Sequence, residues 1–303
     1  MNTQSLSMSR GTVHPSILLL MAVLFWGANY HLTKAALTGY PVFVVAAIRF
    51  GVGFLLIWSY FTGTGIKFLA YVRQKPGTYL SVSMLAILFN ILFFLGISRS
   101  TAFNASIMGA FSPAIMILLS GWLLKLRIRT YQAAGLVIGM TGVLISLSGG
   151  SLAKIAHMHF SSGDLLLLGA SISFSLYSVL SHKLLAPAEM VVGAALNMLV
   201  SALLFTFVAW YTHPDYSLSF NFWPLTAAIS MGIFGTFLAY VFWLRGIASA
   251  GTYMASLLYN LIPLFTYLIS VAAGQSIGLP QTLGGLLIVS GILLAQLLGN
   301  RPR

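Results

Sequence analysis

The sequence predicts an all-α membrane protein with ten transmembrane helices, arranged as two inverted five-helix repeats with both termini cytoplasmic. Three observations support this fold class. Of the 303 residues, 59% are hydrophobic and 6% are charged, with a mean hydropathy of +0.96, whereas a soluble domain carries roughly 25% charged residues. The apolar residues form long continuous runs, which favours membrane helices over the alternating strands of a membrane β-barrel. The two halves of the chain also resemble each other.

The apolar runs predict ten spans, because a helix needs about 20 apolar residues to cross the hydrocarbon core of a bilayer. The predicted spans are residues 16–38, 42–62, 79–98, 102–124, 131–149, 163–185, 188–211, 222–246, 251–273 and 280–299. The connections between them are short and rich in Gly, Pro, Ser and Thr. No stretch remains that would form a water-soluble domain.

An internal repeat organises the chain. Residues 96–115 read GISRSTAFNASIMGAFSPAI and residues 246–265 read GIASAGTYMASLLYNLIPLF, with Gly, Ile, Ala, Ser and Pro coinciding. The same offset of about 150 residues relates other segments, which predicts a first repeat at residues 1–150 and a second at residues 151–303. Five spans in each half invert the second repeat relative to the first, as in many transporters. The alternative is chance similarity between two apolar stretches.

The basic residues predict the orientation, since loops on the cytoplasmic side are enriched in Lys and Arg. The chain has 15 Lys and Arg against 3 Asp and Glu, a net charge of +12. With the N-terminus in the cytoplasm, three basic residues fall on the outer side of the membrane: Lys34, Arg99 and Lys154. Those that fall on the cytoplasmic side are Arg10, Lys67, Arg73, Lys75, Lys125, Arg127, Arg129, Lys183, Arg245, Arg301 and Arg303. The same charges serve better as topology signals and lipid contacts than as a nucleic-acid site.

Several chemistries have no support in the sequence. It has no GxxxxGK[ST] loop for ATP, no HExxH zinc motif and no cysteine, so we expect no enzyme, no cofactor and no metal site. All three acidic residues, Asp164, Glu189 and Asp215, fall at span ends or in loops. A carboxylate at membrane depth that binds cations or carries protons is therefore not expected. Facilitated diffusion down a gradient fits the sequence better than transport that uses a buried carboxylate. Coupling of transport to protons through His31 or another site is the alternative.

Polar and aromatic residues fall on shared faces of the repeated helices, and such faces should point inward because polar groups are costly in hydrocarbon. Ser and Thr on these faces are explained as well by hydrogen bonds between helices. For the larger side chains we favour a substrate cavity. The candidates for its lining are Trp26, Asn29, Tyr30, Asn90, Phe93, Phe111, Tyr177, Tyr240, Trp243, Tyr253, Tyr259 and Asn260.

Four further residues are candidates for a role in transport. Pro113 and Pro263 occupy equivalent mid-span positions, and proline kinks a helix, so they predict either gating bends or fixed bends needed for packing. Arg49 lies within the second span, where a charge is costly and needs a partner. It could bind a substrate carboxylate, although a structural role with backbone carbonyls is favoured. His31 is expected to be a packed or interfacial residue, with a titrating role as the alternative.

The motifs resemble the ten-helix, EamA-type family of the drug/metabolite transporter superfamily. WGANYHLTKAAL and the spacing from Pro41 to Arg49 carry the resemblance, followed by GISRSTAFNASIMGAFSPAI and QAAGLVIGMTGV and by second copies in the other half. The aromatic content is most similar to YddG-type aromatic amino-acid exporters. The family often has Glu where this chain has Leu126 and Gln275. The resemblance implies a transporter. In the same superfamily, it implies, small multidrug exporters rely on an intramembrane Glu, and this chain has no such residue.

These observations predict a multi-pass transporter of the inner (plasma) membrane, acting as a monomer among lipids. We expect it to export small metabolites, in particular aromatic or other neutral amino acids, by alternating access to a cavity between the repeats. The alternative within transport is an exporter of other metabolites or amphipathic drugs. A membrane enzyme, a flippase and a channel are disfavoured, because no catalytic cluster is visible and the repeats carry kinks.

Overall fold

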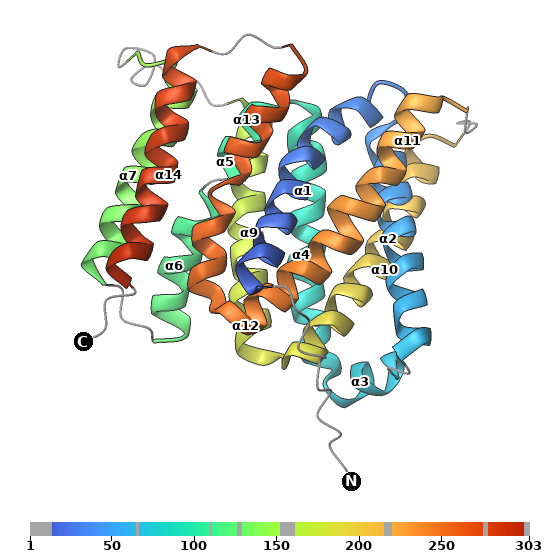
Figure 1. Cartoon of the computed structure of the whole chain (residues 1–303). Coiled ribbons are helices and arrows are strands. Elements are labelled where there is room, and N and C mark those ends of the chain that lie inside the picture. The colour runs from blue at the N-terminus through green and yellow to red at the C-terminus, as the bar shows by residue number, and fades with distance from the viewer. Residues whose placement is uncertain are drawn as a thin grey trace.

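The computed structural model is a bundle of helices (Figure 1). It describes residues 14–64, 67–109, 111–125, 129–151, 161–214, 220–274 and 278–299, and every regular element within those ranges is helical. In the first half they are α1 (Pro15–Ala36), α2 (Val42–Thr64), α3 (Phe68–Gln74), α4 (Pro76–Ser98), α5 (Ala102–Gly109), α6 (Ser112–Leu123) and α7 (Thr130–Ser148). In the second half they are α9 (Ser162–Leu184), α10 (Pro187–Thr212), α11 (Phe222–Ser230), η1 (Met231–Leu238), α12 (Ala239–Tyr259), α13 (Ile262–Ala272) and α14 (Leu279–Gly299).

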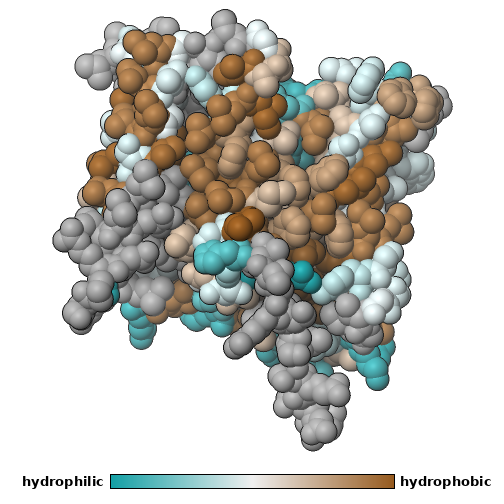
Figure 2. Space-filling view, in the orientation of Figure 1, coloured by the Kyte–Doolittle hydropathy of each residue, from teal (hydrophilic) through white to brown (hydrophobic). Residues whose placement is uncertain are grey.

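Six helical segments are long and apolar enough to cross a membrane, among the residues described. They are Pro15–Ala36, Val42–Gly63, Pro76–Ser98, Ser162–Leu184, Glu189–Thr212 and Phe222–Gly251. Four shorter apolar helical segments accompany them: Ser112–Leu123, Ala133–Ser146, Ile262–Ala272 and Thr282–Gly291. Large apolar side chains are exposed on their outer faces, including Leu55, Val137 and Phe207. Figure 2 shows the same pattern on one face, where brown apolar atoms cover the middle height and teal ones gather toward the lower end.

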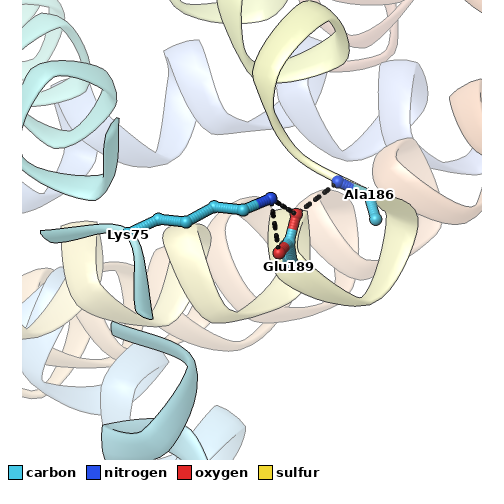
Figure 3. Close-up of polar contacts among 3 residues, drawn as sticks. All are labelled: Lys75, Ala186 and Glu189. Carbon is cyan, nitrogen blue, oxygen red and sulfur yellow. Dashed lines mark hydrogen bonds and ion pairs between the residues drawn. The ribbon is translucent and has the colours of Figure 1, made fainter. Parts of the chain in front are cut away.

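Helix starts are marked by side chains that satisfy free backbone N–H groups. At the start of α9, Ser161 and Asp164 form a capping box, in which each side chain accepts a hydrogen bond from the other residue's backbone N–H. At the start of α10, Glu189 accepts a hydrogen bond of 2.7 Å from the Ala186 N–H. The same carboxylate pairs with the Lys75 ammonium at 2.9 Å (Figure 3), which ties the start of α4 to the start of α10.

The two spans predicted at residues 102–124 and 251–273 are each broken in the middle. The first becomes α5 and α6, and the second becomes the end of α12 followed by α13. Pro113 and Pro263 each occupy the first turn of the helix after the break, where a missing N–H breaks no intrahelical hydrogen bond. A further break lies inside α12, where Gly251 adopts φ 80° and ψ 165°. A left-handed backbone of this kind costs glycine little.

The helices pack across the two halves in a reciprocal pattern. Helix α1 packs on α12 and α13 of the second half, while α9 packs on α4 and α6 of the first. Helix α2 packs on α10, and α7 packs on α14, which stand side by side at one edge of the bundle (Figure 1). The contacts are therefore symmetric between the halves. The packing of α1 on α12 and α13 corresponds to that of α9 on α4 and α6, while the pairs α2–α10 and α7–α14 each correspond to themselves.

Glycine allows the close approach of α7 and α14, as is common between membrane helices. A methyl group on Gly142 would stand 2.5 Å from the Gly284 carbonyl oxygen and 2.9 Å from the Leu287 Cβ. Gly139, on the same helix α7, has open space around it. The two glycines thus provide a matched test of the α7–α14 contact.

We expect Gly142→Ala to destabilise the protein by about 1–3 kcal/mol, because the added methyl group overpacks the contact. Gly139→Ala should leave the stability unchanged or raise it slightly, since alanine favours helix over glycine. Thermal unfolding of the purified protein in detergent measures both. Equal melting temperatures for the two variants would contradict the close contact.

Candidate functional site

The carbonyl group of Gly235 joins three helices at the centre of the bundle. Trp26 of α1 donates an indole hydrogen bond of 3.1 Å to this oxygen, and Arg49 of α2 donates a longer one of 3.5 Å from Nη2. Arg49 Nε also donates to the Thr236 hydroxyl at 2.7 Å. Gly235 and Thr236 belong to η1, a π-helical segment, and π-helical turns occur frequently at functional sites.

The π-helical turn takes the Gly235 carbonyl out of its α-helical pairing with the Ala239 N–H. The N–H of Ala239 donates to the carbonyl of Phe234, five residues back, and not to that of Gly235, four residues back. In an α-helix the oxygen four residues back would be the acceptor. The local geometry of η1 thus supplies an acceptor for side chains of α1 and α2 at a depth where water cannot provide one.

Small residues let η1 approach α2 closely. A methyl group on Gly232 would lie 2.6 Å from the Val52 Cβ, and one on Gly53 would lie 2.7 Å from the Thr236 Cγ2. Both distances are too short for a real Cβ contact. These two glycines therefore set the separation at which Arg49 reaches η1.

Arg49 is a buried cation with no anionic partner among the described residues. Its side chain is 4% exposed, and the guanidinium lies 5.1 Å from the ring centre of Phe50 and 5.6 Å from that of Phe94. The acidic residues Asp164 and Glu189 are engaged at helix starts, Asp164 with Ser161 and Ser100 and Glu189 with Lys75. The third acidic residue, Asp215, lies outside the described ranges.

A central cavity surrounds this arginine. Trp26 holds together its aromatic wall, with ring centres 5.9 Å from Phe174 and 5.8 Å from both Tyr240 and Tyr259. The space open to a water molecule is about 30 Å³, room for about one water. The lining residues are Trp26, Asn29, Tyr30, Arg49, Phe89, Phe93, Phe174, Tyr240, Tyr259 and Ile262. The cavity is therefore narrow and mostly aromatic in this conformation.

A larger vestibule, of about 930 Å³, opens at the end of the bundle that contains Lys34. His31, Lys34 and Ser270 are among the residues that line it. His31 Nε2 lies 2.9 Å from the Thr266 carbonyl oxygen and 3.2 Å from the Ser270 hydroxyl, and so ties α1 to α13. Along α13, Thr266 stands one turn from Ile262 of the cavity and one turn from Ser270 of the vestibule. His31 thus lies at the neck between the two spaces.

The opposite end of the bundle is held together by lysine contacts. Lys75 pairs with Glu189, as described above, and Lys183 at the end of α9 donates a hydrogen bond of 3.1 Å to the Leu123 carbonyl at the end of α6. A lysine placed there satisfies one of the carbonyl groups that a helix end leaves free. The bundle thus has a vestibule at the Lys34 end and two lysine contacts between helices at the Lys75 end.

The structure brings six of the predicted lining residues together around the cavity: Trp26, Asn29, Tyr30, Phe93, Tyr240 and Tyr259. Trp243 and Tyr177 are buried behind this wall, with ring centres 5.0 Å from Trp26 and 6.2 Å from Phe174 respectively. The remaining three described candidates do not line the cavity. Phe111 precedes α6, Asn260 lies in the break before α13, and Asn90 packs between α4 and α10. The structure does not describe the side chain of Tyr253, nor does it describe Leu126 and Gln275.

Asn90 illustrates why a polar residue in a span need not face a cavity. Its amide donates to Asn197 at 3.4 Å and to Ser201 at 3.2 Å, and Ser201 in turn donates to Asn197. All three residues are buried. This cluster joins α4 to α10, which is the helix-to-helix role that small polar residues often have in membranes.

Three lining residues were absent from the predicted set: Phe89, Phe174 and Ile262. Phe89 lies one helical turn before Phe93, and their ring centres are 5.8 Å apart. Phe174 occupies the position in the second repeat that corresponds to Trp26. Helical spacing and the repeat therefore carried a signal for the two aromatic residues, whereas Ile262 looks like any other apolar residue of its helix.

Long apolar helices around a buried aromatic cavity, with a vestibule at one end of the bundle, are typical of membrane transporters. This chain belongs to the EamA-like transporter family, whose model matches residues 15–148 and again residues 161–297. The predicted membership of the drug/metabolite transporter superfamily is thereby confirmed. The YddG-type specificity is not tested by this match.

Two relatives agree with this class, and a solved structure agrees with the fold. The chain is 30% identical over 286 residues to the "uncharacterized transporter YyaM" of Bacillus subtilis (strain 168), with 92% of each chain covered. It is 25% identical over 291 residues to an "uncharacterized transporter" of Archaeoglobus fulgidus, with 92% of this chain and 96% of that one covered. A crystal structure of another protein, 22% identical, superposes with a TM-score of 0.75 over 95% of this chain and 97% of that one, and shows the fold alone.

We expect Thr236→Val to destabilise the protein by about 1–3 kcal/mol, because the Arg49 Nε–H then lacks its nearest acceptor. Thr206→Val is the matched control, since Thr206 is exposed and its hydroxyl bonds only to the Ala202 carbonyl of its own helix. Thermal unfolding in detergent again provides the measurement. A Thr236 variant as stable as the Thr206 variant would show that the contact to Arg49 does not hold η1 in place.

Proposed function

We propose that the chain forms ten transmembrane helices as two inverted five-helix repeats, at residues 1–150 and 151–303, with both termini in the cytoplasm. The two separate family matches support the repeat, and so does the reciprocal packing of α1 on α12 and of α9 on α4. Basic residues at the end that contains Lys75 and Lys183 support the orientation. The protein then lies in the inner (plasma) membrane and functions as a monomer surrounded by lipid.

The proposed activity is export of small carboxylate-bearing molecules with an apolar or aromatic body, by alternating access. Aromatic and other neutral amino acids are the first candidates. The observation that carries this proposal is the guanidinium of Arg49, which borders the cavity without an anionic partner among the described residues. Arginine binds carboxylates in a forked, two-bond geometry. Other metabolites and amphipathic drugs are the alternative cargo.

The unequal ends of the bundle support alternating access. The vestibule at the Lys34 end and the lysine contacts at the Lys75 end are what one conformation of such a carrier requires. Breaks before Pro113 and Pro263 provide positions at which α5–α6 and α12–α13 can bend. Movement at the α12–α13 break would shift Ile262 relative to Trp26 and open the neck.

The cargo proposal is tested by counterflow into proteoliposomes with radiolabelled aromatic amino acids and unlabelled competitors. We expect Arg49→Gln to weaken substrate binding about 10- to 100-fold, since a hydrogen bond to a charged group contributes about 1.5–3 kcal/mol. Arg49→Lys should lose less, because it keeps the charge and loses the forked geometry.

Arg245→Gln is the control for the general effect of removing an arginine. Arg245 bonds to the Tyr60 hydroxyl at 3.2 Å and does not line the cavity. Equal counterflow in the wild type and in Arg49→Gln would show that Arg49 does not bind the substrate. Absence of counterflow and of competition with every carboxylate offered would refute the cargo.

The gating role of Pro263 is tested by Pro263→Ala, which permits α12 and α13 to join into one helix. We expect slower transport and a change in how much of the protein exposes its vestibule. The chain has no cysteine, so a single Thr38→Cys change at the vestibule reports exposure to a membrane-impermeant maleimide. If transport and labelling are both unchanged by Pro263→Ala, the bend serves packing alone.

A further inference from the structure

We propose that the preferred cargo is a monoanionic aromatic or aliphatic carboxylate without an ammonium group, such as a 2-hydroxy or 2-oxo acid. Its negative charge makes the transport electrogenic, so that the membrane potential drives export without a coupled ion. This inference rests on the proposed transport of carboxylates and narrows its substrate class, because it ranks the amino acids below their hydroxy and oxo analogues. Three features of the site carry it: the charge balance around Arg49, the supply of hydrogen-bond donors, and the positions of the acidic residues.

The charge balance around Arg49 favours a net negative ligand. Arginine keeps its positive charge in proteins, and an uncompensated charge at membrane depth is costly. The contacts of Arg49 with Thr236 and Gly235 satisfy donors but supply no negative charge. A monoanion brings the site to neutrality. A zwitterion brings a carboxylate, and it also brings an ammonium group into the same low-dielectric space as the guanidinium.

The hydrogen-bonding groups that face the cavity are matched to a carboxylate. The Nη1 group of Arg49 and the hydroxyls of Tyr30 and Tyr240 make no hydrogen bond with any described residue, and all three residues line the cavity. Each of these groups can donate to a carboxylate oxygen. The hydroxyls can also accept a hydrogen bond, but neither residue offers a negative charge.

An ammonium group has no comparable acceptor in the site. The one amide oxygen of the lining, Asn29 Oδ1, is buried without a hydrogen-bond partner. It packs against Gly235, where a methyl group would clash with this oxygen, and as part of a neutral amide it offers one acceptor without a negative charge. Among the described residues no acidic side chain accompanies it, since Asp164 and Glu189 are held at helix starts. A cationic group placed here would lose its hydration and would meet aromatic rings and one amide oxygen. It would also meet the positive charge of Arg49, with no negative charge among the described lining residues.

The remaining wall of the cavity is apolar and accepts the body of the ligand. Phe89, Phe93 and Phe174 lie on the side of α4 and α9, with ring centres of Phe89 and Phe174 5.2 Å apart. Offset aromatic packing at such distances is favourable. Because the open space is about 30 Å³, a ligand enters only when α1 and α13 separate at the His31 neck. The cavity then fits an aryl or branched alkyl chain with one carboxylate.

The charge that crosses the membrane determines the direction of transport. A carrier with a fixed arginine, and with no acidic side chain at the cavity among the described residues, moves one negative charge with each monoanion. With the cytoplasm negative, that charge is driven outward. Moving one elementary charge across 100 mV amounts to 2.3 kcal/mol, so about 60 mV sustains a tenfold concentration ratio. A zwitterion would carry no net charge and would not respond to the potential.

The test compares L-phenyllactate with L-phenylalanine, which share a ring and a carbon skeleton and differ in a hydroxyl against an ammonium group. The full-length wild-type protein is reconstituted into liposomes, and potassium gradients with valinomycin set the potential. We expect radiolabelled phenyllactate to accumulate about tenfold at about 60 mV, inside positive, and not to accumulate at zero potential. Phenylalanine uptake should be weaker and independent of the potential. Protein-free liposomes measure the passive leak.

Variants separate the charge of Arg49 from its structural contacts. Arg49→Gln should abolish the accumulation of phenyllactate, while Arg49→Lys should keep the response to the potential with weaker binding. Arg245→Gln should behave as the wild type. Melting temperatures measured in parallel identify any variant that has unfolded, and the wild-type comparison of the two ligands does not depend on the variants.

The outcomes distinguish this inference from the proposed function. Preferred and potential-independent uptake of phenylalanine would overturn the monoanion cargo and leave a carboxylate-binding carrier in place. Uptake of phenyllactate that requires a pH gradient would overturn electrogenic transport. If a folded wild-type protein transports neither ligand nor any other carboxylate, the inference and the proposed cargo both fail.

Discussion

The hydrogen bonds that converge on the Gly235 carbonyl are the constraint on which the centre of the bundle depends. Trp26, Arg49 and Thr236 come from α1, α2 and η1, and each needs a partner that lipid cannot supply. A regular α-helix would have used the Gly235 carbonyl for its own ladder. In η1 the Ala239 N–H donates to the Phe234 and Thr236 carbonyls and not to that of Gly235, and the missing side chain of Gly235 leaves room for Asn29. One local irregularity thus positions the arginine and the aromatic wall.

Continuous apolar runs were sufficient to predict where most helices lie, because in lipid each span must satisfy its own backbone. The irregular elements were not predictable in the same way. Pro113 and Pro263 indicated bends, yet a full break with Phe111 or Asn260 and Leu261 outside the helices depends on how neighbouring helices pack. The π-helix of Met231–Leu238 has an ordinary apolar sequence. It packs closely on Val52 and Asn29 through Gly232 and Gly235, and no local pattern in the sequence records these tertiary contacts.

The site was predicted by residue type more reliably than by position. Large aromatic and amide side chains on repeated faces included Trp26, Tyr240 and Tyr259, which do line the cavity. Asn90 has the same signature but pairs with Asn197 and Ser201. Helical spacing assigns a face to each helix, and only the arrangement of neighbouring helices decides whether that face meets another helix or an open space.

Arg49 combines the two interpretations that the sequence left open. Its Nε group makes the structural bond to Thr236, as a packing role requires, while Nη1 and the positive charge remain available to the cavity. A purely structural arginine in a membrane would be expected to use its donors on protein carbonyls and to be paired with an acid. Here the pairing is incomplete among the described residues. If a carboxylate compensates this charge, as proposed, binding it would raise the stability of the fold by an amount that grows with the logarithm of the ligand concentration relative to its Kd.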